Sequence, residues 1–155
     1  MKVVDDLRPP MIQEGMLILG IVNRVTNKAV NVMLPGGVHG IVSVVNVSEF
    51  YVNLVRSGLE VPILQEMFKV GDVLPVKVLS PTEHDPFAFN LTTDPAAINK
   101  LLAYSAIEEG FILVGNVKSE EEHGYVIDFG ISEARGFLRN SKVSRRIFLL
   151  IFFSK

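Results

Sequence analysis

Residues 14–22 read EGMLILGIV, and residues 109–117 read EGFILVGNV. Gly20 and Gly115 hold the same place in the two stretches, each inside an apolar run. A glycine in the interior of a strand often marks a bulge or a tight bend, as at the corner of a barrel. An accidental apolar run need not recur with both glycines in register, whereas a repeated fold must. The two stretches therefore predict two copies of one β-unit, 95 residues apart.

Working outward from residue 14, the sequence predicts five strands in the first copy. Short runs rich in Leu, Ile and Val alternate or cluster as strands do, and turn-forming residues such as the Pro-Gly-Gly of 35–37 separate them. Pro75 lies inside the fourth run and indicates an edge or bulge position, because proline donates no hydrogen bond to the ladder. The strands are expected at residues 17–25, 29–34, 38–44, 70–80 and 86–93.

A different pattern interrupts the first copy at residues 45–68. The run does not alternate, and several of its apolar residues recur at helical spacing. Ser48 or Asn46 is a possible N-cap, and Gly58 a stop signal. We therefore expect a helical insertion between the third and fourth strands.

The segment after the fifth strand reads DPAAINKLLAYSAIEEG. Asp94 is a good N-cap and Pro95 a good first helical residue, because the missing N–H of proline would be unpaired there anyway. A short linker helix is expected at about 95–105. The strand pattern then restarts, with strands expected at 109–117, 124–130 and 134–140.

Nothing after residue 140 resembles the fourth or fifth strand, so the second copy is expected to be incomplete. Its exposed apolar inner face would then be covered by 147–153 folding back, or the region would be disordered or aggregate. The organisation expected is a flexible segment at 1–13, a complete unit at 14–93, a linker at 94–108, a partial unit at 109–140 and an atypical tail at 141–155.

Composition excludes several classes of protein. Hydrophobic residues make up 48% and charged residues 21%, which is a folded composition. The net charge of −2 and the pI of about 5.9 argue against a strongly basic nucleic-acid domain, whose pI usually exceeds ~9, but permit a local basic face. The lack of cysteine excludes disulfides and thiolate zinc sites. The N-terminal stretch MKVVDDLRPP has two acidic residues where a signal peptide would be apolar, which argues against secretion, and the apolar run 147–153 is too short for a membrane helix.

The repeated pattern E-G-x-x-x-x-G-x-V, followed by Asp-Phe-Gly at 128–130 and Gly-Phe-Leu at 136–138, resembles the S1 RNA-binding motif. FKVGDVLPVKVLS at 68–80 resembles the fourth strand of that motif. The resemblance covers 14–93 as a full copy and 109–140 as a partial one. It implies an all-β fold: an OB-type, five-stranded antiparallel barrel, then a short linker helix and a second, incomplete barrel.

The tandem arrangement resembles a narrower family. Divergent repeats joined by an Asn/Asp-Pro-x-x-x-Asn-x-x-Leu helix, with the restart HGYVIDFG, are similar to the N-terminal part of the large eukaryotic multi-S1 ribosomal RNA-processing proteins. The resemblance implies RNA-binding or scaffold repeats that act in ribosomal RNA processing and pre-ribosome assembly, including the small-subunit processome, in the nucleolus of the nucleus. The implied partners are pre-ribosomal RNA and ribosome assembly factors, with no membrane, cofactor, metal or small-molecule substrate.

The resemblance also implies where RNA would bind. S1 repeats use a groove across strands two and three, where two exposed aromatics stack on bases and a histidine and basic residues hold the backbone. In the second copy His123 and Val126 stand at the aromatic positions and Arg139 at the histidine position. His123 can stack and Arg139 can hold a phosphate, whereas Val126 cannot stack. The candidate RNA contacts are Lys28, His123, Tyr125, Arg135, Arg139 and Lys142.

Simpler interpretations remain open for these residues. His123 follows three glutamates and is also explained as a solvated turn residue. The basic stretch after residue 134 is also explained as a charged face. Tyr125 and Phe137 lie in expected strands, where successive side chains face opposite sides of the sheet, so at least one of the two is expected in the core.

The first copy favours a second hypothesis, a protein-interaction OB module without direct RNA contact. Lys28 and Asn31 fill its aromatic positions and Ser43 the histidine position, so no stacking residue remains, although Lys28 can still meet a phosphate. The insertion could instead present apolar side chains to a partner, against the default that they pack on the barrel. The candidate contacts are Phe50, Tyr51 and Leu54.

Catalysis has no support in the sequence. His84 and Asp85 are adjacent, but they lie in a proline-flanked turn without a nucleophile motif, and His39 beside Gly40 is most simply a turn residue. No phosphate-binding loop, nucleophile elbow or metal-ligand cluster occurs. We therefore expect a binding protein and not an enzyme.

Overall fold

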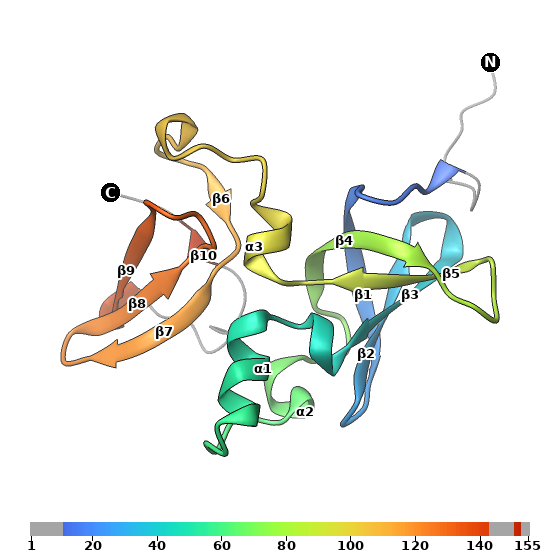
Figure 1. Ribbon diagram of the computed structural model, residues 1–155, viewed down its shortest axis with the longest axis horizontal. Coiled ribbons are helices and arrows are strands. Elements are labelled where there is room, and N and C mark those ends of the chain that lie inside the picture. The colour runs from blue at the N-terminus through green and yellow to red at the C-terminus, as the bar shows by residue number, and fades with distance from the viewer. Residues whose placement is uncertain (1–10, 143–150, 153–155) are drawn as a thin grey trace. The chain divides into compact units, whose positions relative to one another are not determined.

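The chain divides into two compact units, Met1–Thr93 and Asp94–Lys155. The computed structural model describes residues 11–142 and 151–152 of them (Figure 1). Sequence-based expectations for the N-terminal segment therefore fall largely outside the described residues, as do those for most of the tail. No helix in the described part of the chain is long and apolar enough to cross a membrane.

The first unit is the predicted five-stranded barrel. Its strands close in the order β1-β2-β3-β5-β4. Four of the neighbouring pairs are antiparallel, but β3 and β5 run parallel, so the expectation of a wholly antiparallel barrel was wrong at that pair. A parallel pair needs a long connection, which the insertion and β4 supply. The strands are β1 (Leu17–Val25), β2 (Ala29–Leu34), β3 (Val38–Ser43), β4 (Val73–Pro81) and β5 (Ala88–Thr92).

Alternation along these strands builds the core of the first unit. In β2 every second side chain is buried, and the same holds over most of β3 and β4. The 3-10 turn η2 (Pro35–Gly37) joins β2 to β3, and its Gly36 has φ of 79°, a conformation that glycine adopts at little cost. The innermost side chains include Val22, Val30, Val32, Val42, Val76 and Leu91.

β4 begins three residues later than the sequence suggested. Gly71 has φ of 93° and lies in a turn, in which Lys69 N donates to Asp72 Oδ2 at 2.8 Å. Pro75 pairs with Leu19 of β1, whereas the β4–β5 ladder reaches no further than the Lys77–Thr92 pair. Proline is therefore tolerated, because its position in β4 lies beyond the end of the ladder to β5.

The insertion is less helical than its spacing suggested. It contains η3 (Val44–Asn46), α1 (Glu49–Arg56) and α2 (Leu64–Met67), with an extended stretch before α2. Ser48 caps α1, because its Oγ accepts a hydrogen bond from Tyr51 N at 3.0 Å. Gly58, with φ of 75°, follows the end of the helix as predicted.

The second unit contains a three-stranded antiparallel sheet in the order β7-β8-β9 and a separate two-stranded pair, β10-β6. The predicted first strand is thus split into β6 and β7 at residues 114–115. The elements are α3 (Pro95–Ile98), η4 (Tyr104–Ala106), β6 (Ile112–Leu113), β7 (Asn116–Glu121), β8 (Gly124–Asp128), β9 (Arg135–Arg139), η5 (Asn140–Lys142) and β10 (Ile151–Phe152).

The linker helix expected at 95–105 was wrong in length, because α3 ends at Ile98. The next residue, Asn99, is buried, and its Nδ2 donates to Val114 O at 2.8 Å and to Phe129 O at 2.9 Å. This amide joins the linker to the backbone between β6 and β7 and to the residue that follows β8. The two hydrogen bonds fix the backbone at the point where the helix stops.

The two units repeat one another in register. All four residue pairs of β1 with β2 recur between β7 and β8 when 95 is added to each number. The ladder is bulged between Val22 and Arg24 in one unit and between Val117 and Ser119 in the other. β8 pairs with β9 as β2 pairs with β3, and a 3-10 turn follows in both units. The repeat inferred from the opening stretches is therefore confirmed at the level of strand pairing.

Candidate nucleic-acid interfaces

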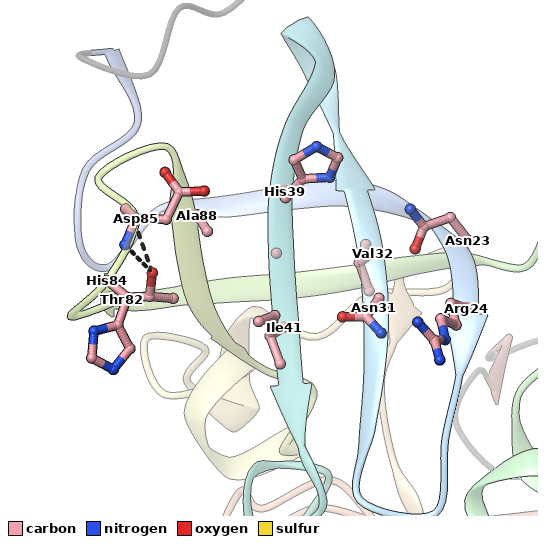
Figure 2. A pocket seen from close by; sticks show the side chains of 11 residues that line it. Asn23, Arg24, Asn31, Val32, His39, Ile41, Thr82, His84, Asp85 and Ala88 are labelled. Carbon is pink, nitrogen blue, oxygen red and sulfur yellow. Dashed lines mark hydrogen bonds between the residues drawn. The ribbon is translucent and has the colours of Figure 1, made fainter.

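The outer side of the first unit bears a hollow of about 490 Å³ (Figure 2). Strands β1, β2 and β3 form its floor, and the β4–β5 loop lies along one side. Both polar and apolar side chains line it. The lining residues are Asn23, Arg24, Asn31, Val32, His39, Gly40, Ile41, Thr82, His84, Asp85 and Ala88.

The strands and the loop position these side chains by different means. Asn31 pairs with Ile41 across β2 and β3, so their side chains share the outer face with His39, two residues away. The loop is held by its own polar groups. Thr82 Oγ1 donates to Asp85 O at 2.8 Å, and Asp85 Oδ1 accepts from Phe87 N at 2.8 Å. This loop carries the exposed His84 to the hollow.

The chemistry of the hollow suits a nucleic-acid strand. The imidazoles of His39 and His84 offer flat faces on which a base can stack, and Arg24 can hold a phosphate. Asn31 adds an amide that can hydrogen-bond a base edge. Among the described residues, no group of three His, Asp or Glu side chains could hold a metal ion.

Sequence reasoning did not select Arg24, His39 or His84 of this hollow as binding residues. His39 was interpreted as a turn residue, but it lies in β3 with its side chain exposed. The alternation with buried Val38 and Gly40 was the available signal for its outward direction. For His84 there was no such signal, because the fold of the loop decides which strands it reaches.

A second candidate surface lies on β9 in the second unit. The side chains of Arg135, Phe137 and Arg139 alternate with inward-facing ones and are exposed, Phe137 to 53%. We call these three residues the Arg-Phe-Arg face. An aromatic ring between two guanidinium groups can stack on a base while the flanking charges hold phosphates.

His123 and Lys142 lie near one end of this face. Gly124 pairs with Arg139, and the next residue, Asn140, donates its backbone N–H to His123 O at 3.0 Å. The His123 side chain is 81% exposed, and its Nε2 lies 4.0 Å from Glu122 Oε2. An exposed pair at this distance contributes little to stability. The structure thus brings four of the six predicted RNA contacts, His123, Arg135, Arg139 and Lys142, to one short sheet and the turn that follows it.

Tyr125 does not share that face. It pairs with Leu138 on the inner side of the sheet and packs against the buried cluster of Leu113, Ile127 and Phe129. Its hydroxyl lies 3.5 Å from Glu120 Oε1. The expectation that at least one of Tyr125 and Phe137 belongs to the core is met by Tyr125, so Phe137 is the outward aromatic.

Lys28 is exposed in the turn between β1 and β2 and does not line the hollow. Its backbone N–H donates to Thr26 Oγ1 at 3.3 Å, and its carbonyl accepts from Val44 N at 2.8 Å. The backbone of Lys28 thus helps to form the turn, while its side chain faces solvent.

The predicted protein contacts of the insertion differ in exposure. Tyr51 is buried, its hydroxyl donates to Pro62 O at 2.9 Å, and burial raises the pKa of its phenol above the ordinary value of 10.0. Phe50 and Leu54 are half-buried. Strongly exposed apolar side chains of the insertion that sequence reasoning did not select are Val45, Val55, Leu59 and Ile63.

The sequence of the chain is similar to those of several known proteins. The chain is 34% identical over 143 residues to the protein RRP5 homolog of Mus musculus, which covers 86% of this chain and 8% of that protein. It is 31% identical over 134 residues to the rRNA biogenesis protein RRP5 of Arabidopsis thaliana, covering 84% and 7%. The chain therefore spans less than a tenth of the length of these relatives.

Among solved structures, the intact alpha subunit of aIF2 from Pyrococcus abyssi is 16% identical, with a TM-score of 0.43, over 54% of this chain and 29% of that one. The fold assignment rests on the strand order described above. A family model, the domain of unknown function DUF8501, matches residues 8–96, which include all five strands of the barrel. The chain belongs to the DUF8501 family.

Proposed function

We propose that this chain provides two S1-type units that bind RNA and act in ribosomal RNA processing and pre-ribosome assembly. The observation that carries the proposal is the S1-type barrel with an open hollow on its strand face, in a chain similar to a protein named rRNA biogenesis protein RRP5. Pre-ribosomal RNA and ribosome assembly factors are the proposed partners. The proposed location is the nucleolus of the nucleus, where ribosomal RNA is processed.

In the second unit the Arg-Phe-Arg face binds a single strand, with His123 and Lys142 extending it. Stacking of one base on an aromatic side chain contributes ~1–3 kcal/mol, and each guanidinium adds a salt-dependent interaction with a phosphate. Phe137, which was not among the predicted contacts, supplies an exposed aromatic ring, whereas the predicted contact Tyr125 packs against the core. The role is one of binding and not of catalysis.

In the first unit the hollow holds RNA through Arg24, His39 and His84. Lys28 contacts the phosphate backbone of an RNA strand that extends beyond the hollow. The barrel therefore retains stacking surfaces at positions other than those at which S1 repeats usually carry them.

A second function is favoured by the exposed apolar side chains of the insertion. Val55, Leu59 and Ile63 are each about half exposed or more, and Phe50 and Leu54 are half-buried. We propose that these side chains contact an assembly factor. The two functions are compatible in one chain.

Titration of the 155-residue chain with a fluorescent single-stranded RNA, at low and at moderate salt, tests the RNA-binding proposal. Changing Arg135 and Arg139 together to Gln should flatten the dependence of log K on log salt by about 1.4, or ~0.7 for each phosphate of a single strand that is no longer neutralised. Lys100→Gln, which removes one exposed charge from the linker, is the control and should change the slope by less.

Changing His39 and His84 together to Ala should weaken binding with little change in the salt slope, because stacking is not ionic. If the unchanged chain shows no binding at either salt concentration, RNA contact is excluded and the interaction role of the insertion remains.

A further inference from the structure

The hollow of the first unit contains a group that contact with an RNA backbone does not explain. Among the described residues that line it, Asp85 is the one carboxylate. A carboxylate repels the phosphates of a nucleic-acid strand, so it weakens a surface that only holds the backbone. The turn around Asp85 does not require the charge either, because asparagine forms the same kind of turn. A contact with a base gives the carboxylate a role.

The loop holds Asp85 in place before any ligand binds. Its backbone carbonyl accepts from Thr82 Oγ1 at 2.8 Å and from Ala88 N at 3.1 Å, and its N–H donates to Thr82 Oγ1 at 3.3 Å. Its Oδ1 accepts from Phe87 N at 2.8 Å. These hydrogen bonds fix the backbone and orient the side chain. A ligand that binds the carboxylate therefore orders little of the loop.

The carboxylate keeps acceptor sites for a ligand. An ionised carboxylate has roughly four lone-pair sites on its two oxygens, and the hydrogen bond from Phe87 N uses one of them on Oδ1. Both oxygens can therefore accept a further hydrogen bond. Asp85 is exposed, so a ligand in the hollow can reach it. The best complement is a planar group with two neighbouring N–H donors.

Guanine is the RNA base with that arrangement of donors. Its Watson–Crick edge places N1–H beside the 2-amino group, so both can donate to one carboxylate. In adenine and cytosine the amino group lies beside a ring nitrogen that accepts, and in uracil the N–H lies between two carbonyls. A carboxylate repels these acceptors. The Watson–Crick edge is open in unpaired RNA, which is the form that sequence-specific RNA-binding proteins mostly recognise.

The side chains around Asp85 provide a stacking surface for the same base. In the view of Figure 2 the Asp85 carboxylate is turned toward the end of the hollow that holds His39, and the His84 ring is turned the other way. The exposed imidazole of His39 offers a face on which guanine can stack. His84 is then left for a neighbouring base.

We propose that the hollow of the first unit selects guanine in single-stranded RNA and that Asp85 is the residue that recognises it. N1–H and the 2-amino group of guanine donate to the two carboxylate oxygens, while the ring stacks on His39. The inference rests on the proposed RNA-binding function and adds the base that the first unit prefers.

Short RNAs of sequence UUXUU, in which X is guanosine, inosine or adenosine, are the probes. Inosine retains N1–H and lacks the 2-amino group. Each RNA is titrated into the 155-residue chain, and the amide shifts of His39, Gly40 and Ile41 report binding at the hollow separately from the Arg-Phe-Arg face. The guanosine RNA should bind about fivefold tighter, or more, than the adenosine RNA, as a good bidentate base contact does. The inosine RNA should lie between them.

Asp85→Asn tests the residue itself. Asparagine can still accept from Phe87 N, but it lacks the second acceptor oxygen. The variant should bind the guanosine and inosine RNAs equally, and an unchanged Phe87 amide shift would show that the turn is intact. Glu83→Gln is the matched control, because it removes one charge from an exposed residue of the same loop outside the lining of the hollow. It should keep the preference for guanosine.

Two results would overturn the proposal and leave RNA binding in place. One is equal binding of the three RNAs by the unchanged chain, which decides the question even if Asp85→Asn disturbs the turn. The other is a guanosine preference that persists in Asp85→Asn. If none of the RNAs shifts the amides of the hollow, RNA binding by the first unit fails together with this inference.

Discussion

At the scale of single residues, the glycines of the opening stretches are explained by close contacts. A Cβ on Gly20 would lie 2.2 Å from Val32 Cγ1 and 3.1 Å from Leu34 Cδ2. A Cβ on Gly115 would lie 2.5 Å from Ile127 Cγ2 and 2.9 Å from Phe129 Cδ1. In both units the crowding side chains follow the glycine by 12 and 14 residues. The glycine recurs because the same two neighbours of the next strand leave no room for a side chain.

Gly20→Ala is therefore expected to destabilise the first unit by about 1–3 kcal/mol through overpacking. Urea unfolding, read as a shift in the midpoint, measures the effect. Val32→Ala in the same chain should recover part of the stability that Gly20→Ala removes, because it deletes the crowding methyl. Asn23→Ala, at an exposed position of β1, is the matched control. An unchanged midpoint for Gly20→Ala would contradict the packing described.

Asn99 is the second residue whose role is decided by its contacts. One amide nitrogen satisfies two backbone carbonyls at a buried site, so Asn99→Leu leaves both without this donor. The expected cost is about 1–3 kcal/mol in the second unit, and Asn99→Asp should cost more, since it sets an acceptor against two acceptors. Thermal unfolding of the two variants, with Lys100→Gln as control, tests this order. Equal stability of the Leu and Asn forms would show that the hydrogen bonds contribute nothing.

At the scale of elements, the insertion shows how a short helix is fixed to a barrel. Ser48 begins α1, and Tyr51, on the first turn, is buried with its hydroxyl bonded to Pro62 O. α1 has eight residues, which is little more than two helical turns. The short α1 is held by a cap and a buried aromatic, which is how helices of this length are generally stabilised.

The buried phenol gives the first unit a pH dependence. Burial raises the pKa of Tyr51 above 10.0, so the folded state retains the proton more strongly than the unfolded chain. Its stabilising effect is therefore fully present below about pH 10, the ordinary pKa of tyrosine, and is lost as the pH rises through the folded pKa.

Tyr51→Phe should remove this alkaline destabilisation and flatten the dependence of unfolding free energy on pH above about 10. At neutral pH the same variant should be less stable by about 0.5–1.5 kcal/mol, because it cannot donate the hydrogen bond to Pro62 O. Urea unfolding at several pH values measures both effects, with Tyr104→Phe, at an exposed position, as the reference. A parallel pH dependence in the Tyr51→Phe and unchanged chains would contradict the assignment.

At the scale of the whole molecule, the chain is built of two compact units that repeat one supersecondary pattern. Each unit has its own buried cluster, and that of the second contains Leu113, Ile127, Phe129 and Ala134. We expect the two to unfold separately. Gly20→Ala should speed hydrogen exchange in β1–β5 alone, and Asn99→Leu in β7–β9 alone. If either variant speeds exchange in both units equally, the chain unfolds as one cooperative block.

Much of the first unit could be predicted from residues near one another in the sequence. The bounds of β1 and β2 match the expected runs, since alternation and the Pro-Gly-Gly turn are local signals. Local signals also predicted the bounds of α1, since Ser48 caps its start and Gly58 follows its end. The length of α3 could not be predicted, because Asn99, where the helix stops, is held by hydrogen bonds to Val114 O and Phe129 O. The hollow could not be predicted from local patterns, because His39 in β3 and His84 in the β4–β5 loop are far apart in the sequence and only the fold brings them to one hollow.

The sequence by itself determined that this protein repeats a glycine-marked β-unit, because the alternation of a strand, its turn residues and the glycines inside it are all properties of short stretches of sequence. The tertiary structure alone decided which faces those strands present. It turned Phe137 outward and Tyr125 inward, joined His39 to His84 across one hollow, and paired β10 with β6. Local patterns fix the alternation of a strand, but only its neighbours determine which side becomes the core.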